Sequence, residues 1–286
     1  MKKISFITFT LLTVCILYTG NNSAIAQDKK LSFGLNVGVG MPVGHYGKSD
    51  SSALPLSSST ANAGKANDTT KYNGFARTGF HFNIYAQYMI VGPLGVKVIL
   101  GGSFNSFDIS TFNSVYGAIY NQNTGNVGTV SPTFTASGGY YIGQYMIGPC
   151  LKLRVTDKIK IEGQILAGLL TGGYPILTQK INSSFVFEGT SYLETGTETY
   201  FTVSSNAFAY NINAGIEYMI TDMIGLHFNV GYTGSSLRFP TYANVANVQL
   251  VGGGYDRSEN SGGVYNIPKT MSIGLIQITV GGSIDL

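Results

Sequence analysis

The sequence is poor in charged residues and contains no tryptophan. Charged residues make up 11% of the 286 positions, against about 25% in ordinary globular proteins. The 17 Lys and Arg residues nearly balance the 14 Asp and Glu residues, which leaves a formal net charge of +3. A chain this close to neutral lacks the basic surface that binds nucleic acid. We therefore expect no nucleic-acid partner.

Cysteine is also scarce, with one residue at position 15 and one at position 150. Cys15 lies in an N-terminal segment that we expect to be removed, so Cys150 has no partner for an intramolecular disulfide. No other Cys and no His lies near Cys150 at the spacing of metal ligands. The sequence predicts no disulfide, no metal site and no cofactor.

The N-terminal residues have the three parts of a secretory signal peptide. Positively charged lysines at 2–3 precede an apolar stretch at 4–18, and a small-x-small cleavage site follows at 24–26. The apolar stretch is shorter than the roughly twenty residues that a membrane-spanning helix needs. We predict an exported protein with a signal peptide at 1–26 and a single domain at 27–286. Removal of the signal peptide takes away two lysines and no acidic residue, so the formal charge falls from +3 to +1.

Long apolar runs are missing from the rest of the chain, which excludes membrane-spanning helices. Apolar residues instead alternate with polar or small ones, which is the pattern of β-strands. The alternation is clearest at 31–41, 77–90, 208–220 and 276–286. There Phe, Ile, Val and Tyr fall on one face of the strand, and Gly, Asn and Gln fall on the other. This pattern is typical of strands that have lipid on one side and a polar interior on the other.

Eight alternating stretches can be placed, and their connections fall into two kinds. The predicted strands are 31–41, 74–90, 94–109, 138–154, 158–172, 206–220, 225–238 and 271–286. Three connections are tight and centre near residues 92, 157 and 222. Four are long and rich in Ser, Gly, Asn, Thr and Tyr; they begin after Met41, Ser110, Gly173 and Phe239. Long and short connections alternate, so the chain repeats a unit of strand, long loop and strand.

A sheet in lipid must close, because open edges leave backbone groups unpaired. We therefore predict an all-β fold, an antiparallel up-and-down transmembrane β-barrel of eight strands. Its short turns face the periplasm and its four long loops are extracellular. The alternative is a secreted β-sandwich or lipocalin-like barrel, which would have a polar outer face and an apolar interior.

The signal peptide, the eight alternating strands, the tight turns on one side and the apolar last strand resemble the small outer-membrane barrels of the OmpA-like and OmpW-like families. The resemblance covers essentially the whole chain after residue 26. The chain differs from them in having no peptidoglycan-binding domain after the barrel, and in ending with Leu286 where such barrels usually end in Phe or Trp. The resemblance implies a porin-like barrel in the outer membrane of a Gram-negative cell. Outer-membrane lipid and the barrel-assembly machinery are then the expected partners.

Most of the charged residues in the strands fall on the inward face. The predicted lumen charges are Arg77, His81, Lys97, Lys152, Arg154, Lys160, Glu162, Glu217, His227 and Asp285. An eight-stranded barrel is just wide enough for side chains to fill, and unpaired charges are costly in a medium of low dielectric constant. We therefore favour a plug of mutually paired charges over an ion path or gate.

The sequence predicts no catalytic residues, because Ser49 and Asp50 close to His45 are common polar residues of a loop rather than a triad. Three functions are compatible with the pattern. The first is a plugged barrel that acts as a structural or surface-interaction protein through its extracellular loops. The second is a narrow porin-like channel or conduit for small or hydrophobic solutes. The third, with the weakest support, is a lipid-modifying enzyme.

Overall fold

The computed structural model describes residues 30–53, 72–123, 128–130, 133–187, 190–202, 204–252, 255–259 and 265–286. The predicted signal peptide lies outside these residues. The barrel strands are β1 (Leu31–Val43), β2 (Gly79–Val91), β3 (Leu94–Asn105), β6 (Tyr140–Arg154), β7 (Ile159–Gly173), β10 (Ser205–Met219), β11 (Ile224–Gly252) and β13 (Tyr265–Asp285). Each of the eight predicted stretches overlaps one of these strands, and β11 and β13 extend well beyond the predicted 225–238 and 271–286.

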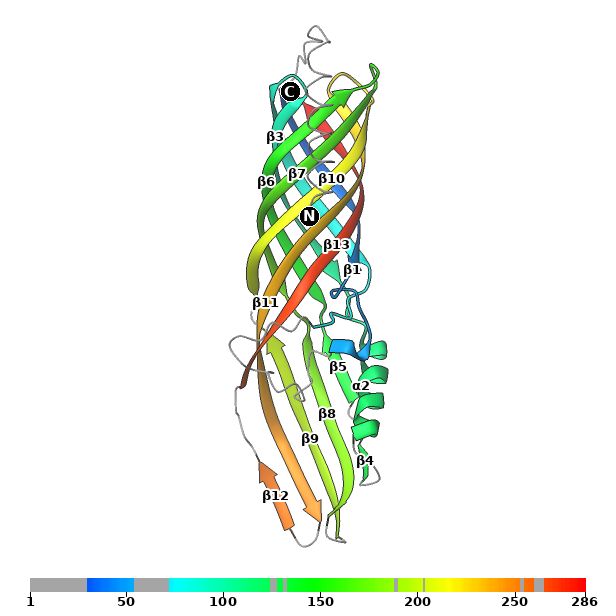
Figure 1. The fold of residues 1–286 in the computed structure, drawn as a ribbon, viewed down its shortest axis with the longest axis vertical. Coiled ribbons are helices and arrows are strands. Elements are labelled where there is room, and N and C mark those ends of the chain that lie inside the picture. Colours follow the sequence, from blue (N-terminus) through cyan, green and yellow to red (C-terminus); the bar gives the residue numbers. More distant parts are fainter. Residues whose placement is uncertain are drawn as a thin grey trace, which may run out of the picture.

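The eight strands form a closed antiparallel barrel (Figure 1). Each strand pairs with the next one along the barrel, and β13 pairs back onto β1 with Val37 opposite Val280. The closure gives every barrel strand a hydrogen-bonded neighbour on both sides, as lipid requires. The predicted fold class, an up-and-down barrel of eight strands, is confirmed.

The three tight turns lie at one end of the barrel and confirm the predicted alternation of connections (Figure 1). Gly92 has a φ of 51°, a left-handed conformation that glycine adopts without strain. The other two turns share one kind of hydrogen bond, from a backbone N–H to a threonine hydroxyl. The backbone N–H of Ile159 donates to Thr156 Oγ1 at 3.0 Å, and that of Ile224 donates to Thr221 Oγ1 at 3.0 Å. A threonine three residues before the next strand thus fixes both turns.

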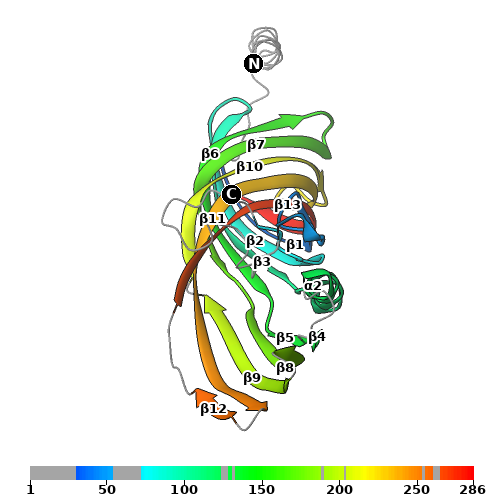
Figure 2. The ribbon, with the colours of Figure 1, turned by 60° about the horizontal axis from the view of Figure 1, so that its bottom comes forward.

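At the opposite end, much of the long connections is regular structure. The described elements there are η1 (Ser51–Ala53), α2 (Ile109–Asn123), β4 (Gly128–Val130), β5 (Thr133–Ser137), β8 (Ile176–Phe187), β9 (Thr190–Thr202) and β12 (Tyr255–Glu259). Strand β11 runs for 29 residues, about 95 Å at 3.3 Å per residue. Its outer part leaves the barrel and pairs with β9 and β12, and β8 adds to β9 (Figure 2). The result is a sheet that projects beyond the barrel mouth.

The helix α2 begins at an N-cap that the loop composition did not predict. Asp108 Oδ1 accepts a hydrogen bond from the backbone N–H of Thr111 at 3.1 Å, and Asp108 Oδ2 accepts one from Thr111 Oγ1 at 2.9 Å. Phe112 and Tyr116, one turn apart on the buried face, pack on Phe134 of β5 with ring centroids 5.1 and 4.8 Å from it. The cap and this apolar stripe explain why the segment is helical.

In the part of the chain that the structure describes, none of the helices has the length and apolar character needed to span a bilayer.

The cap of α2 predicts a dependence on pH. Although its partial burial opposes ionisation, hydrogen bonds from Arg77, Thr111 and Ser110 lower the pKa of Asp108. A lowered folded-state pKa means that the ionised cap stabilises the helix above about pH 4, the ordinary Asp value, and that this stabilisation is lost as the pH falls through the folded pKa. The protection factors of the α2 amides, in which the intrinsic pH dependence of hydrogen exchange is divided out, should therefore fall in acid.

The matched variants are Asp108→Asn and Asp108→Ala. Asn keeps a capping oxygen but loses the charge, so it should abolish the pH dependence and leave most of the cap. Ala should lower the local free energy of opening by about 1 kcal/mol. Equal exchange rates for the wild type and Asp108→Ala would contradict the capping role.

Candidate functional site

The candidate site is a charged layer inside the barrel, near the tight-turn end. At its centre Lys152 of β6 lies between three carboxylates. Its Nζ is 2.7 Å from Glu217 Oε2, 3.3 Å from Asp285 Oδ1 and 3.5 Å from Glu162 Oε1. The Lys152 side chain is 2% exposed and that of Glu217 is 0% exposed. Such buried charges persist only where their partners compensate the loss of hydration.

Two further lysines complete the charge balance. Lys97 Nζ lies 3.3 Å from Glu162 Oε2 and 3.9 Å from the centre of the Tyr85 ring, which adds a cation–π contact. Lys160 Nζ lies 2.7 Å from Asp285 Oδ2. Among the described residues, this layer sets three lysines against three carboxylates, so their formal charges cancel. The layer therefore needs no further ion to balance its charge.

His227 and several hydroxyl groups add further contacts to this layer. His227 Nε2 lies 3.2 Å from Glu217 Oε1 and 2.9 Å from the Tyr85 hydroxyl. Ser283 Oγ donates to Glu217 Oε1 at 2.7 Å, and Ser32 Oγ donates to Asp285 Oδ1 at 2.6 Å. Glu217 and Asp285 thus accept hydroxyl hydrogen bonds in addition to their ion pairs, which helps a protein to tolerate buried ions. Among the described residues, Glu162 Oε1 has only the Lys152 ammonium near it, at 3.5 Å.

Strand register brings these residues together. Counting outward from the tight turns near residues 157 and 222 predicts that Lys152 opposes Glu162 across one hairpin and that Glu217 opposes His227 across another. Both pairs are direct cross-strand partners. Because opposite residues on one face of an antiparallel pair lie within reach of each other, period-two alternation and the tight turns are enough to assemble most of the layer.

The layer also contains the donor types of a divalent-cation site. Ligand atoms of Glu162, Glu217 and His227 lie within 4.8 Å of one another. The Lys152 ammonium, at 2.7 Å from Glu217, and the Lys97 ammonium, at 3.3 Å from Glu162, already supply positive charge at these carboxylates. The geometry is that of an ion-pair cluster, and we assign no metal to it.

A layer of amide side chains lies next to the charged layer, toward the extracellular end. Asn211 Nδ2 donates to Thr233 Oγ1 at 2.9 Å and to Gln277 Oε1 at 3.2 Å, and Gln277 Nε2 donates to Thr233 Oγ1 at 3.0 Å. Gln164 Nε2 donates to Asn211 Oδ1 at 3.0 Å. Thr233 Oγ1 and Gln277 Nε2 also donate to Gln144 Oε1 of β6 at 3.4 Å, so side chains from opposite parts of the wall bond to one another across the bore.

His81 belongs to this polar interior rather than to the charged layer. Its Nδ1 lies 2.7 Å from Ser103 Oγ, and its Nε2 lies 3.3 Å from Asn83 Nδ2. His81 is 0% exposed and Ser103 is 1% exposed. A lipid-modifying enzyme would need a His–Ser pair at the lipid face or the outer rim, and this pair lies inside the wall.

The outermost layer of the lumen is aromatic and aliphatic. Its buried members include Tyr46, Phe75, Phe107, Tyr140, Leu166, Leu170, Leu237, Phe239, Met271 and Ile273. The described parts of the first long connection, 44–53 and 72–78, fold over the mouth here. Tyr46 Oη donates to Asn105 Oδ1 at 3.1 Å, and Tyr140 Oη donates to the carbonyl of Gly74 at 2.5 Å. The extracellular end of the bore is thus packed like a protein core.

The outer face has the opposite character. Ile212 is 51% exposed whereas Asn211 beside it is 3% exposed, and Val280 is 55% exposed whereas Thr279 is 3% exposed. A water-soluble barrel would have the reverse distribution, so the secreted sandwich or lipocalin-like alternative is wrong. A closed barrel with an apolar outer band is the form in which strands cross the outer membrane of Gram-negative bacteria. The protein is an outer-membrane β-barrel.

No protein-family model matches the chain, and no curated protein matches it. Neisserial surface protein A is similar in structure, with 10% identity, 90% of this chain and 97% of that chain covered, and a TM-score of 0.37. A major outer membrane protein from Thermus thermophilus has 11% identity, coverages of 90% and 99%, and a TM-score of 0.39. OprG from Pseudomonas aeruginosa has 10% identity, coverages of 90% and 98%, and a TM-score of 0.31. The fold assignment rests on this chain's own strand pairing.

Two of the predicted lumen charges lie elsewhere. Arg77 precedes β2 and pairs with Asp108 at 2.6 Å outside the mouth, with its side chain 57% exposed. Arg154 is the last residue of β6 and pairs with Asp157 of the adjacent turn at 3.1 Å. Both predictions were wrong because alternation specifies a face only within the strand, and these residues lie at or beyond a strand end where a long side chain reaches water.

The predicted loop around His45 forms no triad. His45 Nδ1 lies 3.2 Å from Asn73 Oδ1, and Asn73 Nδ2 donates to Asp50 Oδ1 at 2.9 Å. Ser52, rather than Ser49, donates to Asp50 at 2.6 Å. The sequence did not indicate Asn73, because it comes from the far end of the same long connection.

The charged layer predicts a large cost for removing its central cation. Lys152→Met keeps most of the length of the side chain but removes its charge, which leaves the surrounding carboxylates with one uncompensated negative charge. The free energy of unfolding in detergent micelles should fall by about 3–5 kcal/mol. Lys158→Met, on the exposed turn nearby, should change it by no more than about 0.5 kcal/mol.

Adding Glu217→Gln to Lys152→Met should recover part of the loss, because it removes one of the unbalanced charges. A cost for Lys152→Met no greater than that of Lys158→Met would refute the ion-pair plug.

Proposed function

We propose that this outer-membrane barrel has a plugged lumen and acts as a structural and surface-interaction protein that displays the projecting sheet outside the cell. The observation that carries the proposal is the charged layer, in which Lys152 is 2% exposed and the carboxylate of Glu217 is 0% exposed. Ion conduction requires hydrated charged groups along a path, and these groups are bonded to one another instead.

The packed mouth is a second, independent support for a plugged lumen. Phe75, Phe107 and Phe112 are in mutual ring contact, and Tyr140 contacts both Tyr46 and Phe107. A solute would have to displace this apolar cluster, the amide layer and then the charged layer. Three chemically different barriers in series favour a closed barrel over a narrow channel or a conduit for small or hydrophobic solutes.

The projecting sheet supports the interaction role. β11 carries it as a continuation of the barrel wall, and β9 pairs with the outer part of β11 from Thr241 to Gly252. A surface held on a rigid strand loses less conformational entropy on binding than a free loop does. The loop sequences are rich in Ser, Gly, Asn and Tyr, a composition suited to adaptable contacts. The proposed partner is an extracellular ligand or protein.

Export is part of the same proposal. The segment 1–26 would direct the chain across the inner membrane as a signal peptide. The barrel-assembly machinery would then insert residues 27–286 from the periplasmic side. Among the enzyme possibilities, the described residues offer no His–Ser pair at the lipid face, so we propose no catalytic activity.

Planar-bilayer recordings test the closed lumen. The wild-type protein should give no conductance steps at any applied voltage. Glu217→Ala should lower the free energy of unfolding by about 3–5 kcal/mol and should still be silent, because the amide and aromatic layers remain. The matched control is Asp157→Ala, whose side chain is 99% exposed. Unchanged stability together with a rise in conductance for Glu217→Ala would favour the ion path.

Cysteine labelling on intact cells tests the display of the sheet. In a Cys150→Ser background, Thr197→Cys on β9 and Asp157→Cys on a tight turn are compared with a membrane-impermeant maleimide. Thr197→Cys should be labelled on intact cells, and Asp157→Cys only after the outer membrane is permeabilised. The reverse pattern would place the sheet in the periplasm and overturn the surface role.

A further inference from the structure

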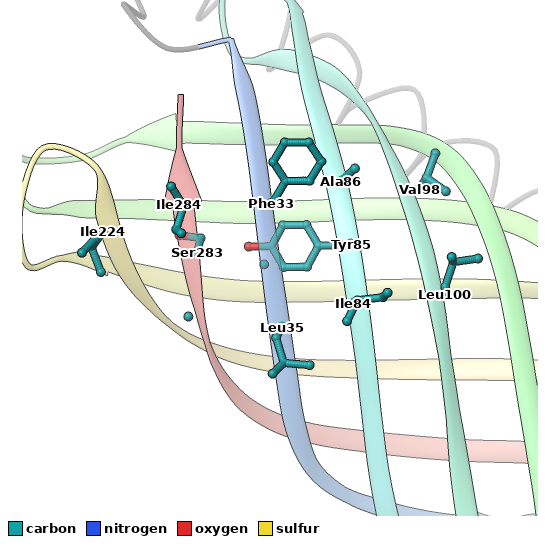
Figure 3. Close-up of a pocket in the computed structure, with 12 residues that line it drawn as sticks. Phe33, Leu35, Ile84, Tyr85, Ala86, Val98, Leu100, Ile224, Ser283 and Ile284 are labelled. Atoms are coloured by element: carbon teal, nitrogen blue, oxygen red, sulfur yellow. The ribbon is translucent and has the colours of Figure 1, made fainter.

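The outer wall of the barrel contains an apolar hollow of about 740 Å³. Its walls are Phe33 and Leu35 of β1, Ile84 of β2, Leu100 of β3 and Ile284 of β13 (Figure 3). These side chains lie on the outward face that contacts lipid, and each is between 44% and 51% exposed. The hollow is therefore continuous with the lipid-facing band, and the inward-facing Tyr85 and Ser283 also line it.

The hollow exists because an outward position carries no side chain. Gly282 of β13 pairs with Leu35 on one side and with Leu226 on the other. A Cβ atom built on Gly282 would meet only the carbonyl oxygen of Gly225, at 3.6 Å. The space between the two leucines is thus open to an incoming group.

The floor of the hollow is supported from inside. A Cβ atom on Gly34 would lie 2.4 Å from Cζ of Tyr85, so the Tyr85 ring lies directly behind this part of β1 (Figure 3). The Tyr85 hydroxyl is held 2.9 Å from His227 Nε2, and Lys97 lies over the ring. Contacts with the charged layer therefore hold the Tyr85 ring in place behind the hollow.

We propose that this hollow binds an acyl chain of a glycerophospholipid from the periplasmic leaflet. Phe33, Ile224 and Ile284 all lie within a few residues of the tight-turn end, which places the hollow in that leaflet. An unfilled gap forfeits the dispersion contacts of its lining, and a flexible apolar chain restores them. Lys30, exposed at the start of β1, offers a cation for the lipid phosphate at the same end.

The absence of tryptophan permits a direct test, because a single introduced Trp is the sole indole fluorophore. Leu100→Trp places it at the hollow, and Ile165→Trp places it on the outward face of β7. Leu100 and Ile165 lie equally far from the first residue of their strands. Each full-length protein is titrated in detergent micelles with phosphatidylcholine brominated in its acyl chains. Half-maximal quenching of Leu100→Trp should need about tenfold less lipid than that of Ile165→Trp.

Filling the hollow supplies the control. Gly282→Leu added to Leu100→Trp should move its quenching curve onto that of Ile165→Trp, whereas Ala214→Leu on the outward face of β10 should not move it. Coincident curves for the two Trp positions, or no effect of Gly282→Leu, would overturn the proposal. So would a change in oligomeric state caused by Gly282→Leu, measured by sedimentation, because it would make the hollow a contact between copies of this chain.

Discussion

The pairing of β13 with β1 is the constraint on which the rest of the structure depends. Lipid offers no hydrogen bonds to a strand edge, so a sheet that crosses the membrane must close on itself. With Val37 opposite Val280 the ring of eight strands is complete. A ring of this size fixes the bore at the width that side chains fill. The side chains of the interior must therefore fill the bore and balance their charges, and each of its three layers does so with a different kind of side chain.

The layers follow a gradient along the bore. Near the tight turns, charged side chains fill the bore, and Lys152 is surrounded by carboxylates. Further along, amides such as Asn211 and Gln277 fill it, and at the mouth rings such as Phe75 and Tyr140 do so. Each layer is stabilised in its own way: the charges cancel, the amides bond across the bore, and the aromatic rings pack against one another, several of them edge to face. In the ionic and amide layers, the polar inward face and the apolar outward face invert the arrangement of a soluble protein.

The strands and most of the charged layer could be predicted because period-two alternation determines which face each residue occupies and tight turns determine the register. Arg77 and Arg154 were misplaced since neither lies within the part of a strand that lines the bore. The helix α2 was missed among polar loop residues, although Asp108 three residues before Thr111, and Phe112 four before Tyr116, are helix signals. The folding of the first long connection over the mouth depends on contacts between distant segments, such as Tyr140 with Gly74, which no local pattern contains.

Strand β11 has a mechanical consequence. It runs without interruption from Ile224 at the tight turn to Gly252 in the projecting sheet, and its ladder with β13 extends from Ile224 opposite Ile284 to Ala243 opposite Tyr265. Ladder hydrogen bonds lie perpendicular to the strands, so tension along β11 loads them in parallel instead of opening them one at a time. A pulling force on the outer sheet is therefore distributed as shear over the whole height of the barrel wall.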